Sequence, residues 1–164
     1  MTAPDIERVL APNPGPMTLE GTNTYVVGRD PAVVIDPGPA DEGHIEKVRA
    51  AAEARGGVGP VLLTHGHSDH SGGIKLLGVA PEVLADGGAV AGITALATPG
   101  HALDHFCFLL DADHPAAAGA GGTVCFAGDL ILGEGSSIVP PAGQGGSHAD
   151  YMHTQRRIQE LELA

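Results

Sequence analysis

The sequence is poor in aromatic and in basic residues. Only 3% of its 164 residues are aromatic and none is tryptophan, so the core must be built from alanine, valine, isoleucine and leucine. Lysine and arginine total 8 against 20 aspartates and glutamates, which gives a formal net charge of −12. This balance argues against a broad basic surface for nucleic acid, but it leaves room for an enzyme that holds phosphate through metal ions.

Cysteines and long apolar runs are also scarce. Cys107 and Cys125 both lie in apolar, strand-like runs, which favours buried thiols over a disulfide framework. No apolar run approaches the roughly 18 residues of a membrane span. Met1 to Leu10 carries three charges and lacks the apolar segment of a signal peptide. We therefore expect a cytoplasmic protein, and the length predicts a single domain over residues 1–164.

The most specific stretch is Thr64 to Gly73, which reads T-H-G-H-S-D-H-S-G-G and follows a short apolar run. If strand geometry continues past Thr64, His65 and His67 share one face, because side chains two residues apart do so in a strand. Asp69 and His70 follow as the chain turns toward its glycines. Imidazole nitrogens and carboxylate oxygens are ligands that zinc takes in proteins, so this stretch predicts a metal site.

Two further candidate ligands follow other predicted strands. His101 comes after the strand expected at 93–98, within Thr-Pro-Gly-His, and Asp129 comes after the strand expected at 123–127, within Gly-Asp. Each motif alone is weak, because a Gly-Asp after a strand is usually a turn. When several strands end in residues of this type, we expect those ends to converge.

The remaining pattern predicts a mixed α and β chain. Apolar runs bounded by turn residues predict further strands at 24–27, 32–35, 61–64 and 106–110. Helices are expected at 41–55, capped by Asp41, at 71–77, and from a cap at Asp150 to the end of the chain. His44 is interpreted as a surface residue of the first helix, and 116–122 as an exposed loop.

The order H-x-H-x-D-H, then T-P-G-H, then G-D resembles the pattern of the metallo-β-lactamase fold superfamily. Other stretches resemble its lactamase-β-like hydrolase branch: Gly21 to Tyr25, Asp36 to Gly38, Ile131 to Gly135, and Asp150 to Met152. That branch includes single-strand endoribonucleases and thioesterases, and its members are often described as glyoxalase II. The resemblance runs over nearly the whole chain.

The resemblance implies an α+β fold, a four-layer αββα sandwich, with an incomplete second half. Members of the branch continue into a strand with a Gly-His-Gly motif and a small helical domain, and these 164 residues contain neither, so the chain is expected to be truncated. Neither His148 nor His153 is expected to replace the missing histidine. The implied ligands are His65, His67 and His101 for a first metal, Asp69 and His70 for a second, and Asp129 as a bridge.

The chemistry that the resemblance implies is hydrolysis by a hydroxide bound to two zinc ions, with iron or manganese as possible replacements. Asp69 would orient the hydroxide or accept its proton. The substrate stays open between a thioester or ester and the phosphodiester of single-stranded RNA. The alternative is a non-catalytic or impaired metal-binding remnant of such a hydrolase. Asp36 is a candidate partner for a ligand histidine, and His105 is expected to be structural or to line the pocket.

Overall fold

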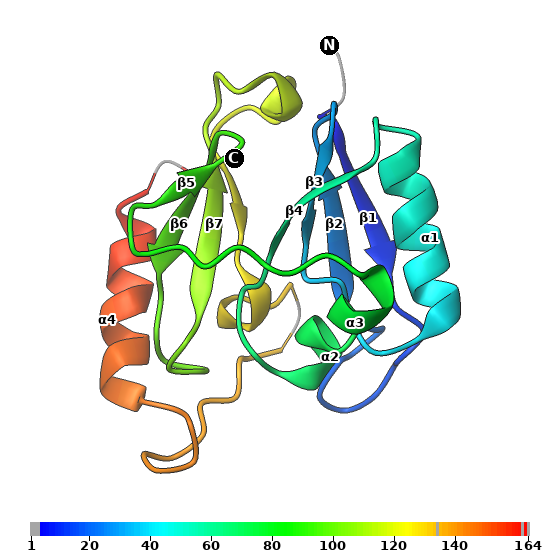
Figure 1. Cartoon of the computed structure of the whole chain (residues 1–164). Coiled ribbons are helices and arrows are strands. Elements are labelled where there is room, and N and C mark those ends of the chain that lie inside the picture. Colours follow the sequence, from blue (N-terminus) through cyan, green and yellow to red (C-terminus); the bar gives the residue numbers. More distant parts are fainter. Residues whose placement is uncertain (1–3, 134, 162, 164) are drawn as a thin grey trace. The chain divides into compact units, whose positions relative to one another are not determined.

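A computed structural model of the chain describes residues 4–133, 135–161 and 163. The described residues form two compact units, an N-terminal unit up to Val83 and a C-terminal unit from Leu84. Each contains one four-stranded sheet, and each is described by itself (Figure 1). The expected α+β class with two sheets is therefore confirmed, while the description of the chain as a single domain stays a prediction.

The sheet of the N-terminal unit has the order β1-β2-β3-β4. Its strands are β1 (Ile6–Leu10), β2 (Asn23–Val27), β3 (Ala32–Ile35) and β4 (Val58–Leu62). Strand β2 runs antiparallel to both β1 and β3, whereas β3 and β4 are parallel. A parallel pair needs a crossover connection, and here α1 (Glu42–Glu53) supplies it. Strand β1 was not predicted, because charged residues interrupt its short apolar pattern.

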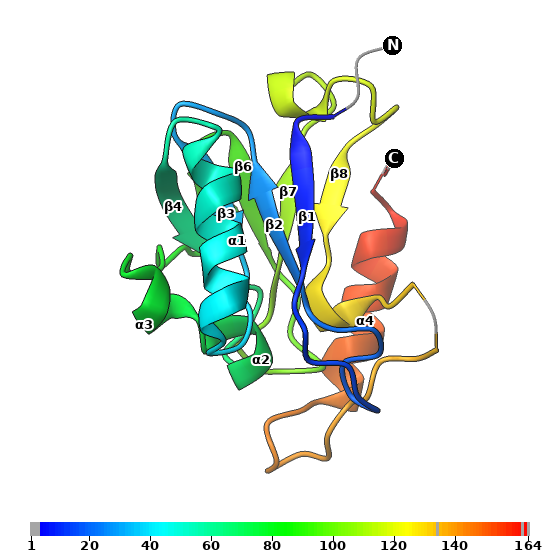
Figure 2. The same ribbon diagram turned by 90° about the vertical axis from the view of Figure 1, so that its right-hand side faces the viewer.

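Helix α1 lies along one face of this sheet (Figure 2). It begins after Asp41, whose carboxylate accepts a hydrogen bond from the backbone N–H of His44, so the predicted cap is confirmed. Ile45, Val48 and Ala52 recur at helical spacing and are buried among the valines of the sheet. This packing holds β3 and β4 in place, and the candidate ligands follow directly after β4.

The sheet of the C-terminal unit is antiparallel throughout, in the order β5-β6-β7-β8. Its strands are β5 (Ala89–Val90), β6 (Ile93–Ala97), β7 (Phe106–Leu110) and β8 (Val124–Phe126). The strands expected at 93–98, 106–110 and 123–127 are thus confirmed to within one residue at each end. Two 3₁₀ turns, η1 (Pro115–Ala117) and η2 (Gly128–Leu130), follow β7 and β8. Ala116 and Ala117 are buried, so the expectation of a fully exposed loop there was wrong.

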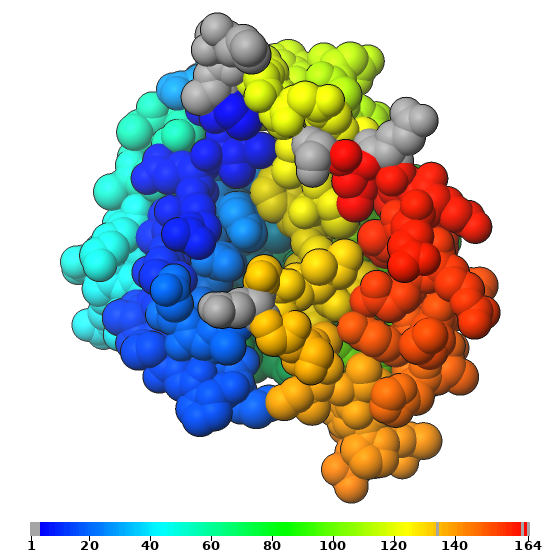
Figure 3. All heavy atoms as spheres, turned by 180° about the vertical axis from the view of Figure 1, so that it is seen from behind, coloured from blue at the N-terminus to red at the C-terminus, as the bar shows by residue number. Residues whose placement is uncertain are grey.

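Helix α4 (His148–Gln159) packs beside this second sheet, and its side chains lie next to the segment around β8 in Figure 3. Ile158 is buried with Cys107 and Leu130, and Tyr151 packs against the same cluster. The helix is capped by Ser147, whose hydroxyl accepts from the N–H of Asp150. The predicted cap at Asp150 was therefore wrong by one turn. A serine before an aspartate in the first turn of a helix is the better capping arrangement.

Three other features concern the expectations from the sequence. The helix expected at 71–77 is two short helices, α2 (Ser68–Ser71) and α3 (Ile74–Leu77), separated by Gly72-Gly73. Both cysteines are free thiols, Cys107 buried and Cys125 half-buried. Among the described residues, none of the helices has the length and apolar content that crossing a membrane requires.

Candidate metal centre

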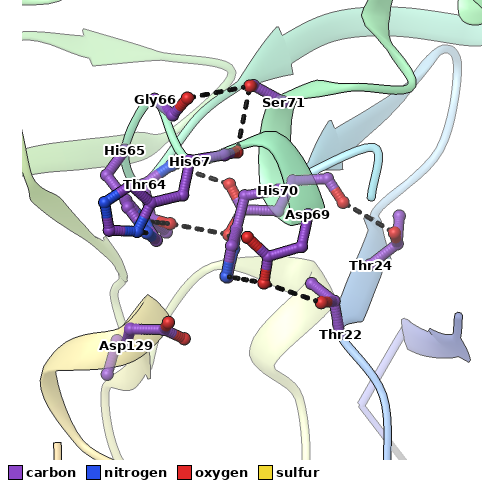
Figure 4. Close-up of polar contacts among 12 residues, drawn as sticks. Thr22, Thr24, Thr64, His65, Gly66, His67, Asp69, His70, Ser71 and Asp129 are labelled. Atoms are coloured by element: carbon purple, nitrogen blue, oxygen red, sulfur yellow. Dashed lines mark hydrogen bonds and ion pairs between the residues drawn. The ribbon is translucent and has the colours of Figure 1, made fainter. Parts of the chain in front are cut away.

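The ligand-type residues of the N-terminal unit lie on the turn between β4 and α3 (Figure 4). Strand β4 ends at Leu62, so His65 and His67 do not extend it as expected. They nevertheless converge, and His67 keeps an extended backbone just before α2. His65 Nε2 lies 2.9 Å from His67 Nδ1. Two imidazole ligands of one tetrahedral zinc, at roughly 2.0–2.1 Å from the ion, would lie about 3.3 Å apart.

Asp69 and His70 occupy α2, one turn further along the chain. His70 Nε2 lies 3.5 Å from Asp69 Oδ2. His70 is buried, whereas the Asp69 side chain keeps 28% of its surface exposed. The contiguous motif therefore brings together two neighbouring pairs of donor atoms, one of two imidazoles and one of an imidazole and a carboxylate.

A close turn holds α2 against the end of β3. The N–H of Gly38 donates to the carbonyl of His70, and the N–H of Gly73 donates to the carbonyl of Gly38. A Cβ at Gly73 would lie 2.6 Å from Ile45 Cδ1 and 2.9 Å from the Pro37 carbonyl oxygen. Only glycine fits this approach, so the glycines of the motif fix where its histidines point.

Asp36 is the buried anchor of this turn. Its Oδ1 accepts from the Thr64 N–H at 2.7 Å, and its Oδ2 accepts from the Thr64 hydroxyl at 2.7 Å. The same Oδ2 lies 2.8 Å from His70 Nδ1. The Thr64 hydroxyl donates its one proton to Asp36. It can therefore only accept a hydrogen bond from His65 Nδ1, which lies 3.0 Å away. One carboxylate thus orients both His65 and His70.

These contacts determine which ring nitrogens can bind a cation. His65 and His70 each donate their Nδ1 proton to an oxygen, so in the neutral ring the lone pair is on Nε2. The same holds for His101 in the C-terminal unit, since its Nδ1 lies 2.7 Å from the carbonyl oxygen of Ile138, which can only accept. Ligand histidines in metal sites usually show this arrangement. The donor set therefore fits a divalent metal ion.

In the C-terminal unit, His101 and Asp129 follow β6 and β8, and His101 Nε2 lies 3.6 Å from Asp129 Oδ2. The turn before His101 is pinned by the start of α4. The N–H of Ser147 donates to the carbonyl of Gly100, and the hydroxyl of Thr154 donates to the carbonyl of Pro99. Within this unit the ends of β6 and β8 therefore bring His101 and Asp129 together, while the expected convergence with His65 stays a prediction.

The other histidines have different surroundings. His105 is buried, with its Nδ1 2.8 Å from the Thr98 hydroxyl, and its role as a structural or pocket-lining residue stays a prediction. His148 and His153 are exposed on α4. The interpretation of His44 as a surface residue was wrong: it is fully buried, and its Nε2 lies 2.8 Å from the Thr24 hydroxyl.

The position of His44 in the helix could have revealed its burial. His44 lies four residues before Val48 and seven before Ala51, on the stripe of α1 that packs against the sheet. Burial lowers the pKa of His44, because the charged imidazolium is disfavoured away from water.

Comparison with known proteins identifies the family. Residues 17–85 match the model of the Metallo-beta-lactamase superfamily. The chain is 36% identical over 181 residues to the lactamase-like protein adaB of Aspergillus niger, covering 97% of this chain and 52% of that protein. It is 35% identical to an atrochrysone carboxyl ACP thioesterase of Aspergillus fumigatus, covering 97% of this chain and 53% of that protein. The chain spans about half the length of the curated relatives that it matches.

Solved structures agree on the fold. A metallo-beta-lactamase family protein of Thermus thermophilus, TTHA1429, superposes with a TM-score of 0.74 at 21% identity, over 95% of this chain and 70% of that one. TTHA1623, solved in a di-iron-bound form, superposes with a TM-score of 0.67 at 24% identity, over 93% and 85%. The chain belongs to the metallo-beta-lactamase superfamily. Within it, the chain is similar to fungal lactamase-like proteins and to carboxyl ACP thioesterases.

Proposed function

We propose that the protein is a metal-dependent hydrolase that acts on a thioester. The observation that carries this proposal is the shared tautomer of His65, His70 and His101, each of which donates Nδ1–H to an oxygen and so keeps Nε2 for a cation.

The proposed ligand assignment follows the superfamily pattern. His65, His67 and His101 would hold one ion, Asp69 and His70 a second, and Asp129 would contact both. Zinc is the proposed ion, with iron or manganese as replacements that imidazole and carboxylate ligands also accept. When bound, such ions supply an activated water at neutral pH and polarise the carbonyl oxygen of a substrate.

Within the chain's own residues, Asp69 is the proposed proton acceptor. Its carboxylate is partly exposed, as a group that meets water and substrate must be. Asp36 would keep the rings of His65 and His70 in place while the proton moves, because its three hydrogen bonds come from a buried network. Because the network is buried, its hydrogen bonds do not compete with water and are stronger than exposed ones.

A thioester is the favoured substrate for two reasons. Two relatives at 35–36% identity carry the name atrochrysone carboxyl ACP thioesterase. The net charge of −12 disfavours the long polyanionic backbone of single-stranded RNA, which basic surfaces normally bind. A cytoplasmic location stays a prediction.

The test is release of thiol from a short acyl thioester, followed with a chromogenic thiol reagent. We expect turnover that stops with a chelator, returns with added zinc, and is absent in His67→Ala. Cleavage of a labelled oligoribonucleotide in place of the thioester would overturn the substrate class. Metal binding without any turnover would support the alternative, a non-catalytic metal-binding protein.

A further inference from the structure

The loop between β1 and β2 reaches the carboxylate proposed as proton acceptor. The Thr22 hydroxyl lies 3.2 Å from Asp69 Oδ2, although 47 residues separate the two in the sequence. Figure 4 shows Thr22 directed at the Asp69 carboxylate. Thr22 is 5% exposed, so its hydroxyl must find its partners within the protein.

The direction of this hydrogen bond is determined by Asn13. The N–H of Thr22 donates to Asn13 Oδ1 at 3.0 Å, and a backbone N–H can only donate, so the amide oxygen must face it. The amide nitrogen of Asn13 therefore faces the Thr22 hydroxyl, to which it donates at 3.1 Å. The Thr22 oxygen thus accepts a hydrogen bond from Asn13, and the single proton of the Thr22 hydroxyl is donated to Asp69.

The loop that carries this pair is itself closely held. Ala11 donates its N–H to the carbonyl of Thr22, and Gly21 donates its N–H to the carbonyl of Thr18. A Cβ at Gly21 would clash with the Ala11 carbonyl oxygen, so another residue there would push the loop apart. The Thr18 hydroxyl donates to the backbone carbonyl of Asn13, beside the amide that contacts Thr22.

We propose that Thr22, oriented by Asn13, is a positioning residue for Asp69. Its hydroxyl fixes the rotation of the carboxylate by holding Oδ2, the same oxygen that lies near His70 Nε2. A carboxylate free to rotate must lose that freedom when it binds a cation, and a donor already in place removes the cost. This inference rests on the proposed function, because it assigns Asp69 to the second metal.

The expected effect follows from other metal sites, where a partner of a ligand typically contributes about 10- to 100-fold in metal affinity. Thr22→Val keeps the shape of the side chain and removes the donor. We expect it to weaken the second zinc equivalent at least tenfold and to leave the first unchanged, in titrations of the metal-free protein with zinc against a competing chelator. Thr22→Ser, which restores the hydroxyl, should return the affinity to within about threefold of the original.

Two further variants separate positioning from structure. Thr18→Val makes the same substitution in the same loop and removes a contact to Asn13 but none to Asp69, so it should leave zinc affinity unchanged. Asn13→Ala acts only through Thr22, so combining it with Thr22→Val should add nothing to the single change. Equal loss of affinity in Thr18→Val and Thr22→Val, or an unfolding midpoint that falls in parallel with zinc affinity, would overturn the proposal in favour of general loop order.

A readout without metal keeps this inference separate from the proposed function. In metal-free protein, the carboxyl carbon of Asp69 should show a deuterium isotope shift from the Thr22 hydroxyl, and Thr22→Val should abolish it while Thr18→Val preserves it. Absence of that shift in the unsubstituted protein overturns the positioning role. Failure to bind two zinc ions, with the shift present, overturns only the metal assignment of the proposed function.

Discussion

The two units hold their candidate ligands in different ways. In the N-terminal unit, a buried carboxylate and two threonine hydroxyls fix His65, His70 and Asp69. In the C-terminal unit the acceptors are backbone carbonyls: that of Ile138 accepts from His101, and that of Asp129 accepts from the Ser137 hydroxyl. One substitution removes the acceptor carboxylate of Asp36, whereas a backbone carbonyl remains when the side chain of its own residue is changed.

The largest loss of stability and of zinc affinity is expected from substitution of Asp36. Asp36→Ala removes the acceptor of three hydrogen bonds from buried donors on Thr64 and His70. Such losses cost about 3 kcal/mol or more of unfolding free energy. Denaturant unfolding of the metal-free protein measures this, and zinc titration should show both equivalents weakened. Asp36→Asn is the matched control, since it keeps an acceptor for Thr64 and should recover part of the stability. Unchanged stability in Asp36→Ala would remove the contrast between the units.

His67→Ala separates binding from folding within the same unit. His67 is exposed, so its removal should change the unfolding free energy by no more than about 0.5 kcal/mol. As a proposed direct ligand, it should nevertheless abolish binding of the first metal and all thioester hydrolysis. Calorimetry measures the unfolding free energy, and elemental analysis of the same preparation measures the bound metal. If this variant retained zinc and activity, the assignment of His67 as a ligand would be wrong.

A smaller effect is expected from the pH dependence of folding. Burial lowers the pKa of His44 below its usual 6.5, so the unfolded chain takes up the proton first as the pH falls. The stabilisation is therefore complete above about pH 6.5 and is lost as the pH falls from there toward the folded pKa. Unfolding of metal-free protein at about pH 7.5 and about pH 5 should show a larger loss for the unsubstituted chain than for His44→Gln. Equal losses would contradict the burial of His44 as the cause.

Ser137→Ala examines the C-terminal unit. It removes one hydrogen bond to the backbone of Asp129, and its cost should be about 1 kcal/mol. Zinc affinity should change much less than in Asp36→Ala, because the backbone acceptor of His101 remains. Parallel titrations of the two variants make the comparison. A loss of zinc affinity as large as that of Asp36→Ala would mean that both units depend equally on single side chains.

The mildest test concerns the two thiols of the C-terminal unit. A hydrogen bond to Cys125 and burial raise the pKa of Cys107, while the hydrogen bond from Cys107 lowers the pKa of Cys125. Since the thiolate is the reactive form, alkylation of native protein should modify the half-buried Cys125 first. Cys107→Ala removes the donor and should slow that reaction. Mass spectrometry follows the labelling of each cysteine. Equal labelling of both from the start would contradict the predicted order.

How far the sequence predicts this protein depends on sequence separation. The motif from His65 to His70 is contiguous, so its pattern alone indicated ligand chemistry, and apolar periodicity placed α1 and most strands. Thr22 and Asp69 lie 47 residues apart, and no local pattern signals their contact. Asp36 was anticipated as a partner for a histidine, but its role toward two of them depends on how β3 and β4 align. Short helices such as α2 and α3 depend on close glycine contacts that composition does not reveal.

The central claim is that these histidines and carboxylates hold two divalent metal ions. The most direct measurement is metal content per chain by elemental analysis, on the unsubstituted protein and on His67→Ala prepared in parallel. The account predicts about two equivalents of a divalent metal for the former and a loss of at least one in the variant. Less than one equivalent in the unsubstituted protein, or equal content in both, would contradict it.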